Sequence, residues 1–304
     1  MPFSLFIDGA AGTTGLEIAD RLAGRSEFAL ITLDEAGRKD PEKRRDALNS
    51  ADFVILCLPD DAARDAEAMV SNPRTRIIDA SSAHRVAQGW TYGFPELSAG
   101  QREAIAGATR VSNPGCYPTG FLALVAPLVA ARLLDPRAPL TCNAVSGYSG
   151  GGKALIERFR ADGALGFRSY GLALDHKHLP EMQAFAGLAQ PPVFAPAVVQ
   201  VFRGMIVEVP LAAGVADAAA VRAALTTHYA GSALVTMPDA VDSELLLRDD
   251  AEGWDGLELF VFGGTNGQLR LAARLDNLGK GASGACVQNL NLMAGLPETA
   301  GLRL

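Results

Sequence analysis

Cys116 stands in the segment whose residue types are best suited to chemistry, Ser112–Gly120 (SNPGCYPTG). Its prolines and glycines predict a tight turn, and the apolar stretch Phe121–Leu134, which we expect to form one helix, follows at once. We therefore expect Cys116 at or beside a helix N-terminus, where backbone N–H groups and the helix dipole lower the pKa of a thiol. The thiolate is an acyl-transfer nucleophile, and the same N–H groups can hold an oxyanion. A free cysteine is more often a small core residue, which is our interpretation of the other three, Cys57, Cys142 and Cys286.

His176 and His178 lie two residues apart in the segment HKHLPEM, and Glu181 follows three residues after the second histidine. A thioester mechanism needs a proton donor and acceptor near neutral pH, which is the usual role of histidine. On a helical turn, Glu181 could orient the imidazole of His178. These residues could also be metal ligands or exposed residues without a role, but no further ligand cluster lies nearby. We therefore favour acid–base chemistry without a metal, and we interpret His84 and His228 as structural or surface residues.

A glycine-rich turn, GAAGTTG, follows the first predicted strand and opens the first predicted helix. Glycines there let the backbone turn sharply and approach a pyrophosphate at the positive end of the helix. Structural glycines are the alternative, but further strand–helix units behind this turn favour dinucleotide binding. The expected cofactor contacts are Gly9, Gly12, Thr13, Thr14 and Gly15.

The choice between NAD and NADP stays open on these residues. Asp34 lies about 20 residues beyond the turn, where an acidic residue would bind the ribose hydroxyls of NAD. Arg38 and Lys39 follow it and could instead hold a 2'-phosphate.

Three further segments are candidates for contact with ligands. The small-residue loop SGYSGGGK at Ser146 follows a predicted strand, Thr141–Val145, and a flexible surface turn explains it nearly as well. Arg85 follows the fourth strand at the carboxyl edge of the sheet, where open α/β sheets bind ligands. The candidate substrate ligands are Arg85, Asn113, Ser146, Ser149 and Lys153. Asn277 and Lys280, in the glycine-containing turn before the last helix, are candidates for the cofactor, and a plain helix start is the alternative.

The elements that must position these residues fall into two patterns. The first third alternates strands with helices, which predicts a doubly wound parallel sheet of the Rossmann-like α/β class. Its predicted strands are Ser4–Ile7, Phe28–Leu33, Phe53–Leu58 and Arg76–Asp79, and its predicted helices are Thr14–Leu22, Arg44–Asn49 and Asp60–Val70. Beyond Cys116 longer strands predict an α+β domain with a mainly antiparallel sheet: Ala197–Val201, Met205–Val209, Leu257–Phe262 and Leu269–Leu275. A last helix is expected at Ser283–Leu292.

Composition excludes several classes of protein. Nearly half of the 304 residues are hydrophobic and the net charge is -7, which suits a globular protein and argues against nucleic-acid binding. The longest apolar stretch is too short and too interrupted to span a bilayer, so no membrane partner is expected. Four scattered cysteines without metal-ligand spacing favour a reduced, cytoplasmic protein.

The motifs together resemble the N-acetyl-gamma-glutamyl-phosphate reductase family in its shorter form, within the aspartate-semialdehyde dehydrogenase-like superfamily. The resemblance covers nearly the whole chain in order, and NPGCYPTG combined with HKHLPE is its most specific part. It implies an NADP-binding domain over residues 1–115 and 283–304, and a catalytic and oligomerisation domain over residues 116–282. It also implies NADP as cofactor, a homodimer or homotetramer, Cys116 as nucleophile and a histidine of the pair as acid/base. We favour His178 over His176, because Glu181 can orient it.

The activity that the resemblance implies is reduction of N-acetyl-glutamyl 5-phosphate by NADPH through a thioester on Cys116. The same chemistry on aspartyl phosphate is the nearest alternative. A non-redox cysteine acyltransferase or hydrolase would need the cysteine and histidine but not the glycine turn. A catalytically idle NADP-binding module would bind the cofactor, but Cys116 would react as an ordinary thiol.

Overall fold

The computed structural model describes residues 1–239 and 243–304, which fold as two compact units. Unit 1 comprises Met1–Pro95, Gly100–Pro114 and Ala282–Leu302, and unit 2 comprises Glu96–Ala99, Gly115–Gly281 and Arg303–Leu304. Among the described residues, none of the helices has both the length and the apolar character needed to cross a bilayer.

Unit 1 is built on a six-stranded, fully parallel sheet in the order β2-β1-β3-β4-β6-β5. Its strands are β1 (Phe3–Asp8), β2 (Phe28–Ile31), β3 (Phe53–Leu56), β4 (Arg76–Asp79), β5 (Thr91–Tyr92) and β6 (Arg110–Ser112). Its helices are α1 (Thr13–Leu22), α2 (Glu35–Lys39), α3 (Pro41–Ser50), α4 (Asp60–Ala68), α5 (Gln101–Gly107) and α10 (Gly284–Met293). This confirms the predicted Rossmann-like parallel sheet, and the order reverses between β1 and β3, where such sheets bind ligands.

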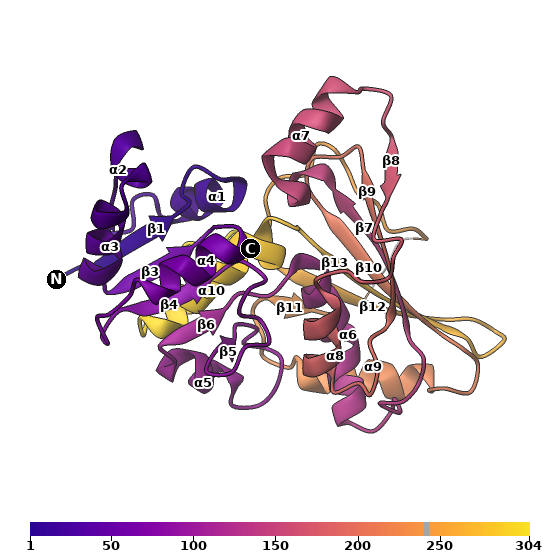
Figure 1. Cartoon of the computed structure of the whole chain (residues 1–304). Helices are drawn as coiled ribbons and strands as arrows, with labels where there is room; N and C mark the ends of the chain where they lie inside the picture. Colours follow the sequence, from indigo (N-terminus) through magenta and orange to yellow (C-terminus); the bar gives the residue numbers. More distant parts are fainter. Residues whose placement is uncertain (240–242) are drawn as a thin grey trace. The chain divides into compact units, whose positions relative to one another are not determined.

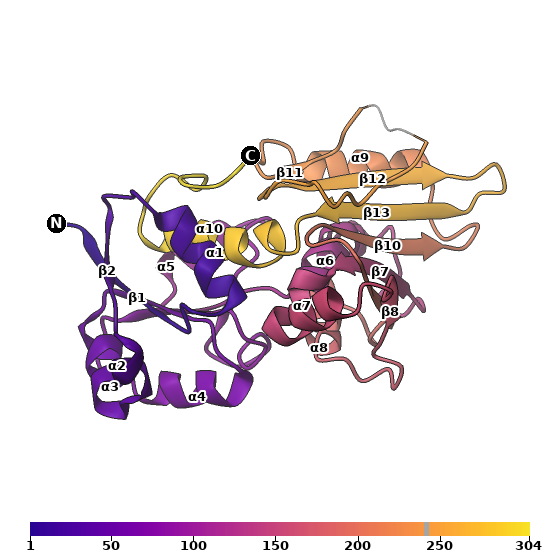
Figure 2. The same cartoon turned by 90° about the horizontal axis from the view of Figure 1, so that it is seen from above.

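Both faces of this sheet are covered, which explains why its strands are continuously apolar. On one face, α1 and α10 contribute Ile18, Leu22 and Val287 to a core shared with Leu5 and Ile55. The opposite core joins side chains of α3 and α4 to the other side of the same strands; among its members are Leu48, Ala63, Val54 and Ile77. Figure 2 shows α1 and α10 on one side of β1, with α3 and α4 on the other.

Unit 2 contains a seven-stranded mixed sheet in the order β11-β12-β13-β10-β7-β9-β8. Its strands are β7 (Thr141–Gly147), β8 (Phe167–Ser169), β9 (Val193–Val199), β10 (Met205–Leu211), β11 (Val235–Thr236), β12 (Leu257–Gly263) and β13 (Leu269–Leu275). Its helices are α6 (Cys116–Ala130), α7 (Gly152–Ala161), α8 (Leu179–Ala186) and α9 (Ala218–His228). Helix α6 packs on β10, β12 and β13 and against α8 and α9, and Figure 1 shows these three helices together along one face of the sheet.

Most of the predicted strands and helices are confirmed to within a few residues, but three details were wrong. The apolar helix starts at Cys116 and ends at Ala130 rather than spanning residues 121–134, because a proline in the first helical turn removes an N–H that has no partner there anyway. The expected loop after residue 145 is the end of β7, a 3-10 turn (Tyr148–Gly151) and the start of α7. Strand β9 pairs parallel to β7 and antiparallel only to β8.

Candidate active site

Cys116 is the first residue of α6, so the structure confirms its expected position at a helix N-terminus. Gly115 precedes it in extended conformation (φ -72°, ψ 150°) and has no side chain to cap the helix. The N–H groups of the first helical turn have no partner within a helix, and they carry the positive end of its dipole. Since α6 is buried over nearly its whole length, these groups act where water screens little. The geometry therefore favours a thiolate at Cys116 and an oxyanion beside it.

The histidine pair lies at the start of α8, which packs against α6. His178 precedes the helix and is 6% exposed, and its backbone N–H donates to Nδ1 of His176 at 3.2 Å. The two imidazole rings are 4.6 Å apart, and the ring of Tyr117 lies 5.9 Å from that of His178. Both histidines are thereby brought beside the first turn of α6, in the same unit as the cysteine.

Glu181 touches the cysteine turn directly. Its carboxylate Oε2 accepts a hydrogen bond from the backbone N–H of Gly115 at 3.1 Å, and the side chain is almost completely buried. Glu181 therefore holds the residue that precedes Cys116. Its predicted orientation of the His178 imidazole stays a prediction.

Two tyrosines and a phenylalanine complete the surroundings of Cys116, and the sequence interpretation missed their role. Tyr117 donates to the carbonyl of Ala197 at 3.0 Å, and Tyr170 donates to the hydroxyl of Tyr117 at 3.3 Å. Burial raises the pKa of Tyr117 well above its usual value and that of Tyr170 to about 12. Both phenols therefore stay neutral, and they lie with Phe194 around the imidazoles. Only the adjacency of Tyr117 to Cys116 could have signalled this.

Gly281 comes from the far end of the chain and lies directly against Cys116. A Cβ on Gly281 would be 2.9 Å from Cys116 Cβ and 3.1 Å from the carbonyl oxygen of Asp276, so only glycine fits without a shift. The sequence identified this segment as a close-approach turn, but not the thiol as its neighbour.

The two predicted cofactor ligands of this segment have contacts within unit 2. Asn277 Nδ2 donates to Ser149 Oγ at 2.9 Å, and its Oδ1 accepts from Gly204 N–H at 3.0 Å. Lys280 forms a buried ion pair with Glu96 at 2.8 Å. Their roles as cofactor ligands stay predictions.

The predicted substrate ligands of the 146–153 segment have different surroundings. Ser146 is buried at the end of β7 and donates to the carbonyl of Gly147 at 3.1 Å. Ser149 is also buried and accepts the bond from Asn277. Lys153, in the first turn of α7, is exposed. Their roles as substrate ligands stay predictions.

The glycine turn of unit 1 fits a dinucleotide. Gly9 has φ +91°, and a Cβ there would overlap the carbonyl of Cys57. A Cβ on Gly12 would meet only the carbonyl oxygen of Gly9, at 3.3 Å, so the space above Gly12 is open to a ligand. Gly12 precedes α1 without a side-chain cap, which leaves the N–H groups of Thr13, Thr14 and Gly15 for a phosphate.

The residues predicted to select the cofactor lie in and before α2. Asp34 Oδ1 accepts from the backbone N–H of Gly37 at 2.7 Å, so this carboxylate caps α2. Arg38 Nε donates to the carbonyl of Leu33 at 3.0 Å, and Lys39 pairs with Glu35 on the exposed side of the helix. All three side chains thus have partners within this segment, and their roles in selecting the cofactor stay predictions.

A buried polar network lies at the carboxyl edge of this sheet. Arg85 is 8% exposed, and its Nε donates to the carbonyl of Asn113 at 3.2 Å. Asn113 Nδ2 donates to the carbonyl of Ala282 at 2.9 Å. Asn289 on α10 donates to Asn113 Oδ1 at 3.1 Å, and its own Oδ1 is buried without a hydrogen-bond partner among the described residues. Such an acceptor can be satisfied by a ligand N–H, and no sequence motif singled out Asn289.

His84 has a structural environment in unit 1. Its Nδ1 lies 2.7 Å from Asp79 Oδ2, and its ring stacks on Trp90 at 4.1 Å. Among the described residues, no group of three histidine, cysteine or acidic side chains is arranged to hold a metal ion.

Family models match both parts of the chain. Residues 5–108 match a model described as semialdehyde dehydrogenase, NAD binding domain, and residues 116–277 match one described as semialdehyde dehydrogenase, dimerisation domain. The second match spans a domain named for subunit association.

Curated relatives match over almost the entire chain. The chain is 50% identical to N-acetyl-gamma-glutamyl-phosphate reductase 2 of Nostoc sp., and 50% identical to the protein of that name from Pseudomonas putida, with 98% of each chain covered in both comparisons. It is 49% identical to N-acetyl-gamma-glutamyl-phosphate reductase of Burkholderia ambifaria, with 96% of each chain covered.

Solved structures with low sequence identity share the fold. Aspartate semialdehyde dehydrogenase II of Vibrio cholerae superposes with a TM-score of 0.75 at 16% identity, covering 97% of this chain and 99% of that one. The aspartate semialdehyde dehydrogenase of Candida albicans, solved with NADP, gives a TM-score of 0.65 at 14% identity, with coverages of 96% and 99%.

Proposed function

The chain belongs to the N-acetyl-gamma-glutamyl-phosphate reductase family, and we propose that it reduces N-acetyl-glutamyl 5-phosphate with NADPH to N-acetylglutamate 5-semialdehyde, NADP and phosphate. The observation that carries this proposal is Cys116 as the first residue of the buried helix α6, beside His178 and Glu181. An acyl phosphate needs a nucleophile that can form a thioester and expel phosphate, and a cysteine thiolate at a helix N-terminus suits that task.

The first step uses the cysteine and the helix that begins with it. The Cys116 thiolate attacks the acyl carbonyl, a tetrahedral oxyanion forms, and its collapse expels phosphate and leaves a thioester. Backbone N–H groups of the first turn of α6 hold the oxyanion. Glu181 keeps Gly115, and with it the start of the helix, in position through the hydrogen bond to Gly115 N–H.

The second step needs a hydride and then a proton. Bound NADPH supplies the hydride that reduces the thioester. Hydride addition leaves a tetrahedral oxyanion on the carbon bound to Cys116, and its collapse breaks the C–S bond, releases the aldehyde and returns the thiolate. His178 shares its proton with that oxyanion and takes it back as the C=O bond reforms; in the reverse direction it accepts the proton of the hemithioacetal hydroxyl as the hydride leaves. His176 holds the backbone N–H of His178 through Nδ1 and so fixes the position of the acid/base residue.

Cofactor binding is assigned to unit 1. The N–H groups of Thr13, Thr14 and Gly15 would hold the pyrophosphate above Gly12, and Arg38 with Lys39 would select the 2'-phosphate of NADP. Residues 1–115 and 283–304 then form the cofactor domain, and residues 116–282 the catalytic domain. Arg85, with its planar guanidinium, suits the carboxylate or phosphate of the substrate.

The protein is an oligomer-forming enzyme of small-molecule metabolism, since it carries the semialdehyde dehydrogenase dimerisation domain. Within the proposal it forms a homodimer or homotetramer through unit 2, in the cytoplasm, where a thiol nucleophile stays reduced. The sheet face turned away from α6 supports this, because Ile206, Glu208 and Arg270 line an open hollow on it.

The test is phosphate-dependent reduction of NADP, followed at the nicotinamide absorbance, with N-acetylglutamate semialdehyde and aspartate semialdehyde side by side. Turnover of the acetylated aldehyde, with NADP preferred to NAD, is the expected result. Turnover of aspartate semialdehyde alone would overturn the substrate and keep the chemistry. Turnover of neither aldehyde would overturn the proposed reaction.

A further inference from the structure

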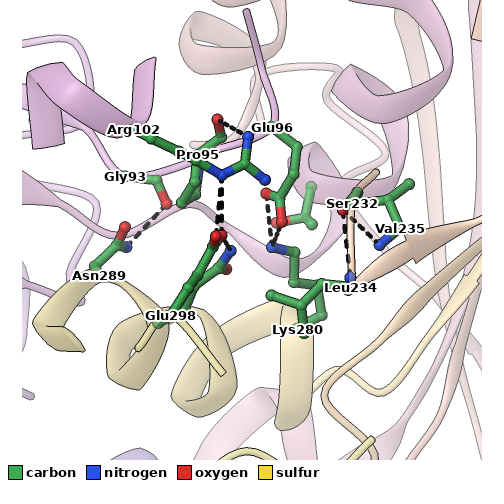
Figure 3. Close-up of polar contacts among 12 residues, drawn as sticks. Gly93, Pro95, Glu96, Arg102, Ser232, Leu234, Val235, Lys280, Asn289 and Glu298 are labelled. Atoms are coloured by element: carbon green, nitrogen blue, oxygen red, sulfur yellow. Dashed lines mark hydrogen bonds and ion pairs between the residues drawn. The ribbon is translucent and has the colours of Figure 1, made fainter. Parts of the chain in front are cut away.

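A fully buried ion pair joins two distant segments of unit 2, as the close-up in Figure 3 shows. The ammonium of Lys280 lies 2.8 Å from both carboxylate oxygens of Glu96, and each side chain is only 1% exposed. The backbone carbonyl of Glu96 is also held, because Nε2 of His228 lies 2.9 Å from it. Glu96 is therefore fixed at both its main chain and its side chain.

Stability alone does not explain this ion pair. Removing two charges from water costs about as much as their attraction returns, and well-packed apolar residues of similar size are often as stabilising. An ion pair with two short contacts instead constrains geometry, because it fixes the position of the lysine side chain and of the backbone that carries it. Two residues of the segment that Lys280 belongs to, Gly279 and Gly281, have no side chains, so the Lys280 side chain is the one that fixes the part of the segment between them.

That segment is the π-helical turn Gly279–Ser283, which lies against the nucleophile. The carbonyl of Asp276 accepts hydrogen bonds from both Gly279 N–H and Gly281 N–H at 3.0 Å. Gly279 lies against the carbonyl of Trp254, and Gly281 lies against Cys116, with 2.9 Å between the place of its Cβ and Cys116 Cβ. Lys280 stands between these two close approaches, and its side chain is the one that extends into the pair with Glu96.

We propose that the Glu96–Lys280 ion pair is a positioning element for Cys116, because it holds Gly281 against the nucleophile. The role rests on the proposed function, since it acts on the cysteine that carries the thioester. Neither side chain needs to touch the substrate. The pair acts through the backbone of Gly281, which limits the orientations open to the thiol at the start of α6. If this turn could move away, the Cys116 side chain could rotate away from the helix N-terminus. Its sulfur would then lose the backbone N–H groups that stabilise the thiolate.

The test replaces both charges at once, in Glu96→Met with Lys280→Met, so that no unpaired charge is buried. The matched control removes the part-exposed Arg102–Glu298 pair of unit 1, which Figure 3 also shows, as Arg102→Met with Glu298→Gln. The glutamine keeps an acceptor for Gln288, which donates to Glu298. Both proteins are measured for melting temperature, for NADPH affinity by fluorescence, for kcat and KM, and for the rate constant of Cys116 alkylation by iodoacetamide.

We expect the Glu96/Lys280 variant to lose about tenfold in kcat and in the alkylation rate constant, less than the roughly 10²-fold that a full 1 Å misplacement of a reacting group can cost. Its KM should stay within about twofold. Its NADPH affinity should do so too, because Glu96 occupies the Lys280 ammonium; a larger loss would make Lys280 a cofactor ligand instead and would overturn the proposal. The control variant should alkylate at the wild-type rate. Lys280→Arg keeps the positive charge but changes the geometry of the pair, and it should give an alkylation rate constant between those of the wild type and the double variant. It provides a second test in case the double variant does not fold. Folded variants whose alkylation and kcat match the wild type would overturn the proposal. Alkylation needs no substrate, so its result stands even where the wild type fails to reduce NADP with either aldehyde.

Discussion

Two helices of this protein begin in nearly the same way. Both α1 and α6 follow a strand of the parallel sheet, and each begins directly after a glycine in extended conformation. Gly12 has φ -77° and ψ 166°, and Gly115 has φ -72° and ψ 150°; neither helix has a side-chain cap. Each therefore presents backbone N–H groups and a positive dipole end without a resident partner from a capping side chain.

The two helices differ in what surrounds that end. Only four residues of α1 are buried, and a Cβ on Gly12 would touch only one backbone atom, which suits a ligand that arrives and leaves. In α6 twelve of fifteen residues are buried, and the first turn is held by Glu181 and Gly281. Within the proposed function, the comparison assigns one backbone geometry to two tasks: it would bind a dissociable phosphate where packing is open, and it would carry a covalent nucleophile where packing is closed.

Replacing the nucleophile should have the largest effect. Cys116→Ala is expected to lower turnover on the order of 10⁴-fold or more, as loss of a covalent nucleophile does in other enzymes. NADPH affinity, measured by fluorescence titration, should stay within about twofold, because the cofactor turn belongs to α1. Turnover that persists in this variant would eliminate the thioester route. A large loss of NADPH binding would show that the α6 end also takes part in cofactor binding, against the separate roles proposed for the two helix N-termini.

The acid/base residue should come next. His178→Gln is expected to lower kcat about 10²- to 10⁴-fold, the usual contribution of general acid–base catalysis. His176→Gln is the matched variant and should have the smaller effect, because His176 accepts the backbone N–H of His178 and so acts on its position. The kcat of both variants is measured by steady-state kinetics with the acetylated aldehyde. A greater loss of kcat in His176→Gln would make His176 the acid/base residue and His178 the positioning residue.

Filling the open end of α1 should affect the cofactor alone. Gly12→Ala adds a methyl group that meets only the carbonyl oxygen of Gly9, so the fold should tolerate it. The methyl group occupies the space expected for the pyrophosphate, and we expect NADPH affinity to fall about tenfold, or about 1.4 kcal/mol. Gly163→Ala, where a Cβ meets nothing within 4 Å, is the control. An unchanged dissociation constant in Gly12→Ala would show that the cofactor does not approach this helix.

Local patterns in the sequence were enough to predict both helix ends. The strand–glycine–helix order of residues 3–22 and the proline–glycine turn before Cys116 depend on short-range backbone chemistry, and both were found within a few residues. The contacts made by Gly281 and Glu181 with the cysteine turn depend on packing between segments far apart in the chain. No local period or motif encodes such contacts, and for the same reason Glu96 and Asn289 were not predicted. Lys280 was singled out, but as a cofactor ligand and without its partner.

A second thiol sharpens the comparison, because Cys57 lies against the glycine turn rather than at a helix end. A Cβ on Gly9 would be 3.3 Å from Cys57 Cβ. Burial, and to a lesser extent the negative charges of Asp79 and Asp8, raises the pKa of Cys57 from 9.0 to about 12. Iodoacetamide at mildly alkaline pH should therefore modify Cys116 and leave Cys57 unmodified, as peptide mass spectrometry would detect.

The same pKa shift predicts a loss of stability in alkali. In the unfolded chain the thiol of Cys57 ionises near pH 9, whereas in the folded chain it stays protonated until about pH 12. Because the raised pKa favours the folded state only while the thiol is neutral in both states, this contribution is complete below pH 9.0 and is lost as the pH rises toward 12. The free energy of unfolding should fall by about 1 kcal/mol per pH unit more in the wild type than in Cys57→Ala, measured by urea unfolding. Parallel curves for the two proteins across that range would mean that Cys57 ionises in the folded state, and the glycine turn would then hold a second thiolate.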